Sequence, residues 1–306
     1  SMTSGGGVVK YDRDGNLCWY RRVYPRQTNY FSGVASDESL NIYVAGGRGS
    51  NAQLMKLSPA GESLWLKVYD FGYPLEDIVS LYYSTDGYIV GAGDVAVGGG
   101  QFDCLSIKWN AIGDVSWFRI LHVKPQDEAR DITADSEGNL YITGDGWEEW
   151  GQGIVQPDSF VTARYQPDGT LDWVRVDGLS HFSWGEGIGF DPSGQLLVAG
   201  GCYDSILNES SGAILCYSLD GTLQWHWTYR QENWNCWFTD IVIAEPGVCY
   251  VIGEVANASY DSSDFLVLKL RYPVGIAEGR PAEVPGGDIS PATLVRAGAA
   301  LRFSVG

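Results

Sequence analysis

A tryptophan recurs four residues after a turn glycine along most of this chain. The segment DGNLCWYRR places Trp19 after Gly15, and GESLWLK, GDVSWFR, GTLDWVR and GTLQWHW repeat the spacing. Successive tryptophans of the series are 46, 52, 56 and 52 residues apart. An enzyme has no use for so many copies of one catalytic residue, so the repetition indicates architecture. Self-similarity on this scale is typical of a chain built from repeated structural units.

Two phrases alternate within each period. One is a hairpin centred on a turn, as in TADSEGNLYITGD, and the other is a strand, a turn and a tryptophan strand, as in VTARYQPDGTLDWVRV. Short runs rich in Val, Ile, Tyr and Trp between Gly, Asp, Pro and Ser turns predict β-strands. Each period therefore holds four strands, called a, b, c and d in chain order. Four-stranded units repeated along a chain predict an all-β fold, a β-propeller of four-stranded blades.

These phrases resemble the bacterial β-propeller repeats known as SBBP, which are related to NHL propellers. Hairpins such as NLYITG and phrases such as VVKYDRDGNLCW carry the likeness, which covers roughly residues 8–272. The resemblance implies a bacterial protein that is secreted or displayed on the cell surface. It is specific for the fold and says little about function, because propellers host many unrelated activities.

The number of blades depends on how the ends of the chain are used. Five a–b hairpins are evident, whereas six c strands are expected, starting near Val8, Leu54, Leu105, Val161, Ile214 and Phe265. The tail SPATLVRAGAALRFSVG aligns on EARDITADSEGNLYITG, so residues 290–306 are predicted to supply strands a and b of a sixth blade. That blade would be completed by residues 8–23, which closes the ring and removes an exposed sheet edge.

Two alternatives to six blades stay open. In the first, the tail is the opening of a secretion sorting domain, which often follows these propellers, and five blades are closed by the Trp19 strand. In the second, the chain is a fragment of a larger ring.

The sequence divides into four segments. Residues 1–7, with the start SMTSGGG, are expected to be an expression remnant and a flexible lead, because they lack a hydrophobic signal segment. Residues 8–272 hold the propeller repeats. Residues 273–289 are rich in Pro and Gly and are predicted to be a linker. Residues 290–306 are the closing strands or, in the alternative, the sorting-domain remnant.

Several tryptophans stand outside the repeated strand pattern, and we predict that they lie in b–c or d–a loops. In a propeller those loops share one face, around the mouth of the channel. Aromatic side chains beside carboxylates are typical of a recognition surface, since indole rings stack on sugars or cations. The alternative is that these aromatic side chains fold back and plug the channel. The predicted ligand-binding residues are Trp147, Trp150, Trp184, Trp234, Trp237, Tyr73, His181, Glu186 and Asp131.

The charge of the chain excludes several partners. It has 20 Lys and Arg against 38 Asp and Glu, a net charge of −18. Such a surface repels nucleic acid and anionic lipid, and no apolar run is long enough to span a membrane. We therefore expect no nucleic-acid partner, no membrane insertion and a monomer.

Signatures of metal binding and catalysis are weak. The six cysteines form no CxxC pair, which argues against a zinc site. A disulfide between Cys202 and Cys236, both expected in loops, is left open. His122 and His226 are interpreted as structural, and there is no GxSxG nucleophile elbow. The turn DRDGN lacks the downstream Glu of a calcium loop.

Together these features predict a binding or scaffolding module for a carbohydrate or a peptide, with no cofactor and no enzymatic activity of its own. One alternative is a glycoside hydrolase or polysaccharide lyase that uses loop carboxylates, because paired carboxylates can cleave glycosidic bonds. A third alternative is a purely structural spacer.

Overall fold

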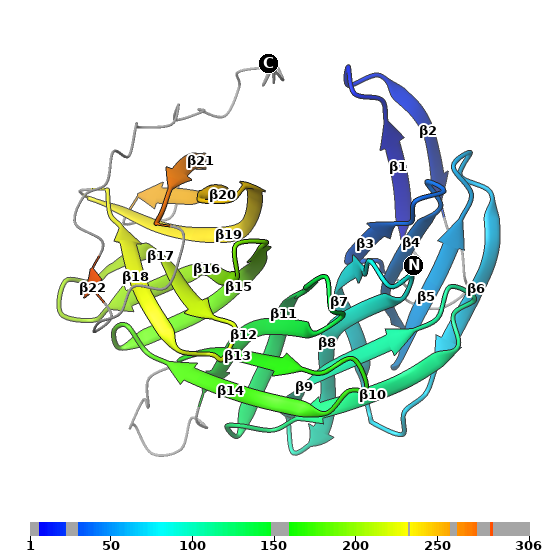
Figure 1. The fold of residues 1–306 in the computed structure, drawn as a ribbon, viewed down its shortest axis with the longest axis horizontal. Coiled ribbons are helices and arrows are strands. Elements are labelled where there is room, and N and C mark those ends of the chain that lie inside the picture. Colours follow the sequence, from blue (N-terminus) through cyan, green and yellow to red (C-terminus); the bar gives the residue numbers. More distant parts are fainter. Residues whose placement is uncertain are drawn as a thin grey trace. The chain divides into compact units, whose positions relative to one another are not determined.

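The computed structural model describes residues 6–22, 30–147, 159–231, 233–257, 262–273 and 282–283. Within these ranges the chain forms strands and turns and no helix, so the all-β prediction is confirmed (Figure 1). The structure has two compact units, Ser1–Ile142 with Tyr165–Leu171 (unit 1) and Thr143–Arg164 with Asp172–Gly306 (unit 2).

Unit 1 contains a two-stranded hairpin and two four-stranded antiparallel sheets, ordered β3-β4-β5-β6 and β10-β9-β8-β7. Each sheet follows the predicted order a, b, c and d. The strands are β1 (Gly7–Tyr11), β2 (Leu17–Arg22), β3 (Gly33–Ser36), β4 (Ile42–Arg48), β5 (Asn51–Leu57), β6 (Ser63–Tyr69), β7 (Glu76–Tyr83), β8 (Ile89–Gly98), β9 (Gln101–Trp109), β10 (Val115–Leu121) and β11 (Gln126–Ala134).

The sheet β11-β12-β13-β14 contains the boundary of the two units, and unit 2 continues with β15-β16-β17-β18-β22 and β19-β20-β21. The strands are β12 (Leu140–Trp147), β13 (Ser159–Tyr165), β14 (Leu171–Asp177), β15 (Phe182–Asp191), β16 (Gln195–Asp204), β17 (Glu209–Ser218), β18 (Leu223–Tyr229), β19 (Trp234–Glu245), β20 (Val248–Asn257), β21 (Ser263–Arg271) and β22 (Ala282–Glu283). Four-stranded antiparallel sheets in this sequential order are typical of propeller blades.

The predictions about the chain ends fall mostly outside the described residues. Residues 290–306, on which a sixth blade and ring closure depend, are among those not described. Within the predicted linker, the two-residue strand β22 pairs in parallel with β18, where Trp225 is the partner of Ala282. The expected linker therefore contributes an outer strand to one sheet.

Three of the repeat tryptophans, Trp19, Trp117 and Trp173, fasten their strand to the c–d turn of the following sheet. Nε1 of Trp19 donates to the carbonyl of Pro59 at 3.1 Å, and Nε1 of Trp173 donates to Leu219 at 2.9 Å. The turn glycine allows this contact, since Gly221 has a φ of +81° and a Cβ there would lie 2.7 Å from the Trp173 ring. The architectural interpretation of the repeat tryptophan is confirmed by these contacts.

An arginine two residues after the tryptophan completes the fastening. Nε of Arg175 donates to the carbonyl of the turn glycine Gly221 at 2.7 Å, and Nε of Arg119 donates to Gly169 at the same distance. The guanidinium of Arg175 also lies 5.4 Å from the centre of the Trp173 ring. The indole and the guanidinium of one d strand therefore both donate hydrogen bonds to backbone carbonyls of the same c–d turn. We call this arrangement the indole–arginine clamp.

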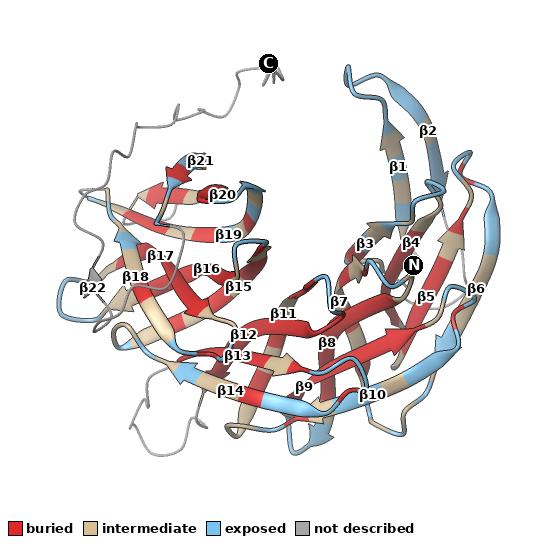
Figure 2. Ribbon diagram, in the orientation of Figure 1, coloured by how far each residue is buried: buried red, intermediate tan, exposed pale blue. Residues whose placement is uncertain are grey.

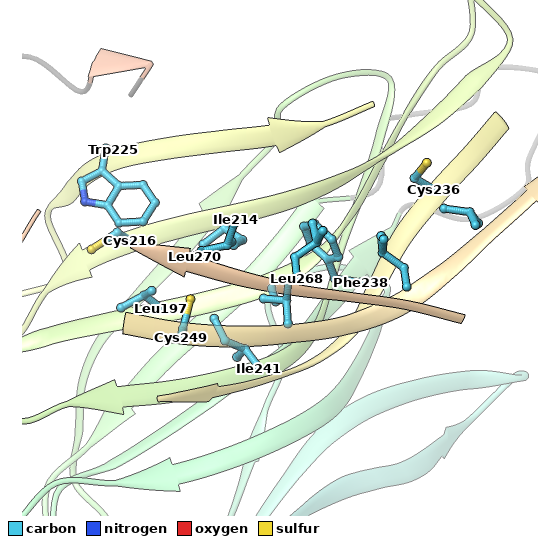
Figure 3. Close-up of a cluster of buried hydrophobic side chains, with 14 residues drawn as sticks. Leu197, Ile214, Cys216, Trp225, Cys236, Phe238, Ile241, Cys249, Leu268 and Leu270 are labelled. Carbon is cyan, nitrogen blue, oxygen red and sulfur yellow. The ribbon is translucent and has the colours of Figure 1, made fainter. Parts of the chain in front are cut away.

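The core is made mainly by the b and c strands, with apolar residues of the a strands packed against them. Figure 2 shows β8 largely buried and β2 largely exposed, in agreement with their residue patterns. In unit 2, Phe238 and Ile241 of β19 pack with Leu197 of β16 and Ile214 of β17 (Figure 3). Strands covered on both faces carry continuous apolar runs, which explains segments such as LLVAG and ILCY.

The clamp predicts a large loss of stability when its indole is removed. Trp173 has only 8% of its surface exposed, so Trp173→Ala is expected to lower the free energy of unfolding by about 3–5 kcal/mol. Gly221→Ala should also destabilise, because its Cβ would collide with the ring. Chemical denaturation would measure both effects. As a control, Leu171→Ala in the same strand, at a side chain 44% exposed, should change stability by about 0.5 kcal/mol or less.

Candidate functional site

The predicted ligand-binding tryptophans lie in strands, so their assignment to loops was wrong. Trp184 lies in β15, Trp234 and Trp237 lie in β19, and Trp147 is the last residue of β12. Trp150 lies outside the described residues. The a strands β15 and β19 begin earlier than their sequence pattern indicates, because a bulge in each interrupts the alternation of apolar and polar residues.

One position of the a strand recurs with a fixed geometry, and we call it the crossing position. Its backbone carbonyl lies against the Cα of a glycine in strand b, so that a Cβ on Gly200 would stand 1.9 Å from the carbonyl oxygen of Trp184. The same approach places Asp77 over Gly93, Trp237 over Gly253 and Tyr30 over Gly46. Glu76 and Asp127 each accept hydrogen bonds from backbone amides of the loop that precedes their strand. Asp77 directly follows Glu76, and Glu128 directly follows Asp127, so Glu128 occupies the crossing position of β11.

In unit 1 the crossing residues Tyr30, Asp77 and Glu128 form an acidic site together with Asp94 of the b strand β8. Asp77 and Asp94 stand directly opposite each other in the β7–β8 pair. Burial raises the pKa of Asp77 and raises the pKa of Asp94 well above its ordinary value. The Tyr30 hydroxyl, whose own pKa burial also raises, donates to Asp77, and Asp94 Oδ1 accepts from the amide of Ala129 at 2.8 Å.

Two further charged residues of β11 stand next to this site. Arg130 pairs with Glu128 at 2.5 Å, which leaves a guanidinium beside the carboxyl groups. The predicted residue Asp131 accepts a hydrogen bond from Ser80 Oγ at 2.5 Å. Tyr73, also predicted as a ligand-binding residue, lies in the loop before β7 and packs partly buried against the hydrophobic core of unit 1.

In unit 2 the crossing residues Trp184 and Trp237 form an aromatic site together with Glu186 and Asp240, which follow them in the same strands. A Cβ on Gly201 would lie 2.4 Å from the Trp184 ring, so the indole lies over that glycine. Trp184 and Trp237 are both partly exposed. The strands that carry them touch, since a Cβ on Gly187 would lie 2.7 Å from the Cα of Asp240. Burial raises the pKa of Asp240.

Other predicted residues of unit 2 are placed beside the aromatic site or away from it. Trp234, at the start of β19, packs partly buried against the hydrophobic cluster shown in Figure 3. His181 is exposed in the loop before β15 and acts electrostatically on Asp204. The rings of Phe182 and Tyr203 lie 5.8 Å apart, and they connect this loop to the end of β16.

The cysteines give no disulfide in the described part of the chain. Cys202 lies in β16 and Cys236 in β19, both buried and both free, so their expected position in loops was wrong. Burial raises the pKa of both thiols, which makes them poor nucleophiles at neutral pH.

Sequence reasoning missed two groups of residues. Asp94 occupies the place of the second glycine in the VAGG hairpins, and this substitution was the signal that could have identified it. Asp103, His122 and Asp127 come together at one end of the sheet β7–β10, with their potential ligand atoms within 4.8 Å of one another. His122 had been interpreted as structural, whereas its side chain is 63% exposed and its Nδ1 lies 2.7 Å from Asp103.

Comparison with known proteins agrees with the repeat phrases. Residues 117–149 match the family model of the SBBP beta-propeller repeat. Over 220 residues the chain is 23% identical to an uncharacterized WD repeat-containing protein of Acanthamoeba polyphaga mimivirus. The alignment covers 63% of this chain and 14% of that relative's length. The resemblance to propeller repeats is therefore confirmed.

Similar solved structures share the fold at low sequence identity. The WD40 domain of Neurospora crassa Pan2 has a TM-score of 0.52 and 11% identity, over 89% of this chain and 72% of that chain. An ulvan lyase bound to a saccharide of GlcA and Rha3S has a TM-score of 0.54 and 11% identity, over 87% of this chain and 72% of that chain. Among the described residues there is no helix that could cross a membrane.

The acidic site predicts an unusual dependence of stability on pH. Because the folded pKa of Asp94 lies above the ordinary value of 3.8, the protein loses stability as pH rises from that value towards the folded pKa. Asp94→Asn removes the ionisable group, while its amide oxygen can still accept from Ala129. The variant should melt at a higher temperature than the wild type at pH 7, and the difference should vanish below about pH 3.8.

Asp204→Asn is the matched control for this measurement. The amides of Leu207 and Ile206 lower the pKa of Asp204, so its charge stabilises the fold above the unfolded pKa and that contribution is lost as pH falls. This variant should therefore melt at a lower temperature at pH 7. An Asp94→Asn variant that is less stable than the wild type at pH 7 would contradict our account of the acidic site.

Proposed function

We propose that this protein is a binding module and that its ligand is a carbohydrate held by the aromatic site of unit 2. The observation that carries the proposal is the recurrence of Trp184 and Trp237 at the same crossing position of two touching strands. Both indoles are partly exposed, and each has a carboxylate a few residues further along its strand. Flat aromatic rings beside hydrogen-bonding groups are suited to binding sugar rings.

The chemistry of the site favours sugars over the other ligand classes. An indole face stacks on the C–H groups of a sugar ring, while Glu186 and Asp240 can accept hydrogen bonds from its hydroxyls. Both residues are half-buried, which strengthens such bonds relative to those in bulk water. A net charge of −18 disfavours polyanionic glycans. We therefore propose a neutral or amino-substituted glycan, with a peptide as the other class to be tested.

The remaining parts of the proposal concern architecture and location. Six strands at the c position lie in the described residues, β1, β5, β9, β13, β17 and β21, and we propose a propeller of six blades on that basis. We also propose a monomer that works outside the cell or at its surface, which rests on the resemblance to SBBP repeats. The ulvan lyase with a bound saccharide supports the idea that such a fold can present a glycan site.

A glycan and peptide array followed by calorimetry on the best ligand would test the binding proposal. Trp184→Ala should weaken the affinity by roughly tenfold or more, as expected for a central aromatic residue, while Trp184→Phe should retain most of it. Tyr20→Ala is the control, because this aromatic residue is 55% exposed on β2, far along the chain from the aromatic site. It should bind as the wild type does.

Two outcomes would reject this function. If Trp184→Ala and Trp237→Ala both stay folded and bind with unchanged affinity, the ligand is held elsewhere. If glycan and peptide arrays are both blank, the protein is a structural spacer.

A second candidate function is suggested by the acidic site of unit 1. Asp77 and Asp94 are directly paired and their pKa values are raised by burial, a property of carboxyl groups that act as general acids. Such a pair could cleave a glycosidic bond. Incubation with oligosaccharides should then release shorter products, and Asp77→Asn or Asp94→Asn should reduce the rate by about 10²-fold or more. Intact oligosaccharides after prolonged incubation with the wild type would exclude this activity.

A further inference from the structure

Asp127 has one carboxylate oxygen that the fold uses and one that it does not. Oδ2 accepts from the amides of Val123 and Lys124, at 2.6 and 2.8 Å, and so holds the loop between β10 and β11. Asp127 is completely buried, and Oδ1 has no hydrogen-bond partner. A buried acceptor without a partner costs free energy, and burial raises the pKa of this carboxyl group. A cation or a proton bound at Asp127 Oδ1 would therefore stabilise the folded protein.

Two further ligand-forming side chains, Asp103 and His122, lie close to the Asp127 carboxylate. Asp103, 6% exposed near the start of β9, approaches His122 with its Oδ1 2.7 Å from Nδ1. The donor atoms of Asp103, His122 and Asp127 all lie within 4.8 Å of one another. Bonds of about 2.0–2.2 Å to one ion place ligand atoms somewhat closer than this, and the exposed His122 ring can rotate to close the difference. The three residues come from a c strand, a d–a loop and an a strand of unit 1.

The equivalent positions after the sheet β3–β6 lack this combination. They are Asn51 of β5, Asp70 and Glu76 of β7, and Glu76 Oε1 caps its loop by accepting from the amides of Phe71 and Tyr73, as Asp127 caps its own loop. Glu76 Oε2 is likewise buried without a partner, but no histidine stands beside it. An unpartnered carboxylate oxygen therefore occurs at both loop caps. Of these two caps, only Asp127 is joined by an imidazole and a second carboxylate in the described residues.

We propose that Asp103, His122 and Asp127 bind a divalent transition-metal ion of the zinc class. An imidazole nitrogen with two carboxylates is a ligand set that suits Zn²⁺ and its neighbours, whereas Ca²⁺ and Mg²⁺ prefer sites built of oxygen atoms alone. The ion would neutralise two carboxylates that otherwise stand close together and would satisfy Asp127 Oδ1. It would also tie the start of β9 to the loop before β11. With three protein ligands and an exposed His122, the remaining coordination positions face water.

Calorimetry with Zn²⁺ on tag-free, chelator-treated protein tests the site. We expect one Zn²⁺ per chain, bound more tightly than Ca²⁺ or Mg²⁺, and an increase in melting temperature when Zn²⁺ is added. His122→Ala and Asp127→Asn should each weaken Zn²⁺ binding by on the order of tenfold or more. Asp127→Asn keeps an oxygen that can accept from Val123 and Lys124, so this variant is designed to remain folded.

Two matched controls separate the site from general surface binding. His181→Ala removes another exposed histidine, and Glu76→Gln removes the equivalent carboxylate of the neighbouring sheet while retaining its loop-capping oxygen. Both should bind Zn²⁺ as the wild type does. Binding should also weaken at acidic pH, because a protonated imidazole cannot bind a metal ion.

Three results would overturn the proposal. The first is the absence of binding at millimolar Zn²⁺, and the second is equal affinity for Ca²⁺ and Zn²⁺. The third is a loss of affinity in His181→Ala as large as that in His122→Ala.

Discussion

The structure depends on the contact between one d strand and the next c–d turn. The indole of Trp173 and the guanidinium of Arg175 both donate to backbone carbonyls of the turn that contains Gly221. The glycine is needed twice, since its φ of +81° is unfavourable for other residues and a Cβ would strike the ring. A single sheet has two apolar faces that it cannot cover alone, and this contact sets the register in which its neighbour covers one of them.

The acidic and aromatic sites are consequences of a second close approach. The carbonyl of each crossing position lies against a glycine of strand b, and this fixes where the side chain of the crossing residue stands. The fold therefore fixes the position of this side chain but not the identity of the residue. In unit 1 the position is occupied by Tyr30, Asp77 and Glu128, and in unit 2 by Trp184 and Trp237. Functional side chains can differ from sheet to sheet because only the backbone is constrained.

The features that recur in each repeat could be predicted from the sequence, whereas the positions of individual site residues could not. Turn glycines, strand runs and the Trp19 series report the same local geometry several times, so their meaning could be inferred without a structure. Trp184 and Trp237 were assigned to loops because the bulges at Gly185 and Phe238 break the alternation by which a strand is recognised.

The sites themselves depend on pairing that the sequence does not state. Asp94 is one carboxylate among many until its strand partner is known to be Asp77. Likewise, His122 gained its significance only when the register placed Asp103 and Asp127 beside it. Such sites combine residues from three strands or loops, and no local pattern encodes the distance between them.

The indole–arginine clamp donates its hydrogen bonds to main-chain oxygens. The indoles donate to Pro59, Pro167 and Leu219, and the arginine Nε atoms donate to the turn glycines. Carbonyl oxygens are the same in every residue, so a sheet does not depend on the side-chain identity of its neighbour's turn beyond the glycine. A copy of the repeat that carries the clamp can therefore precede any copy that has the turn glycine. A gene encoding such a chain can lengthen by duplication of whole units, and each new copy arrives already compatible with its neighbours and free to diverge at its crossing position.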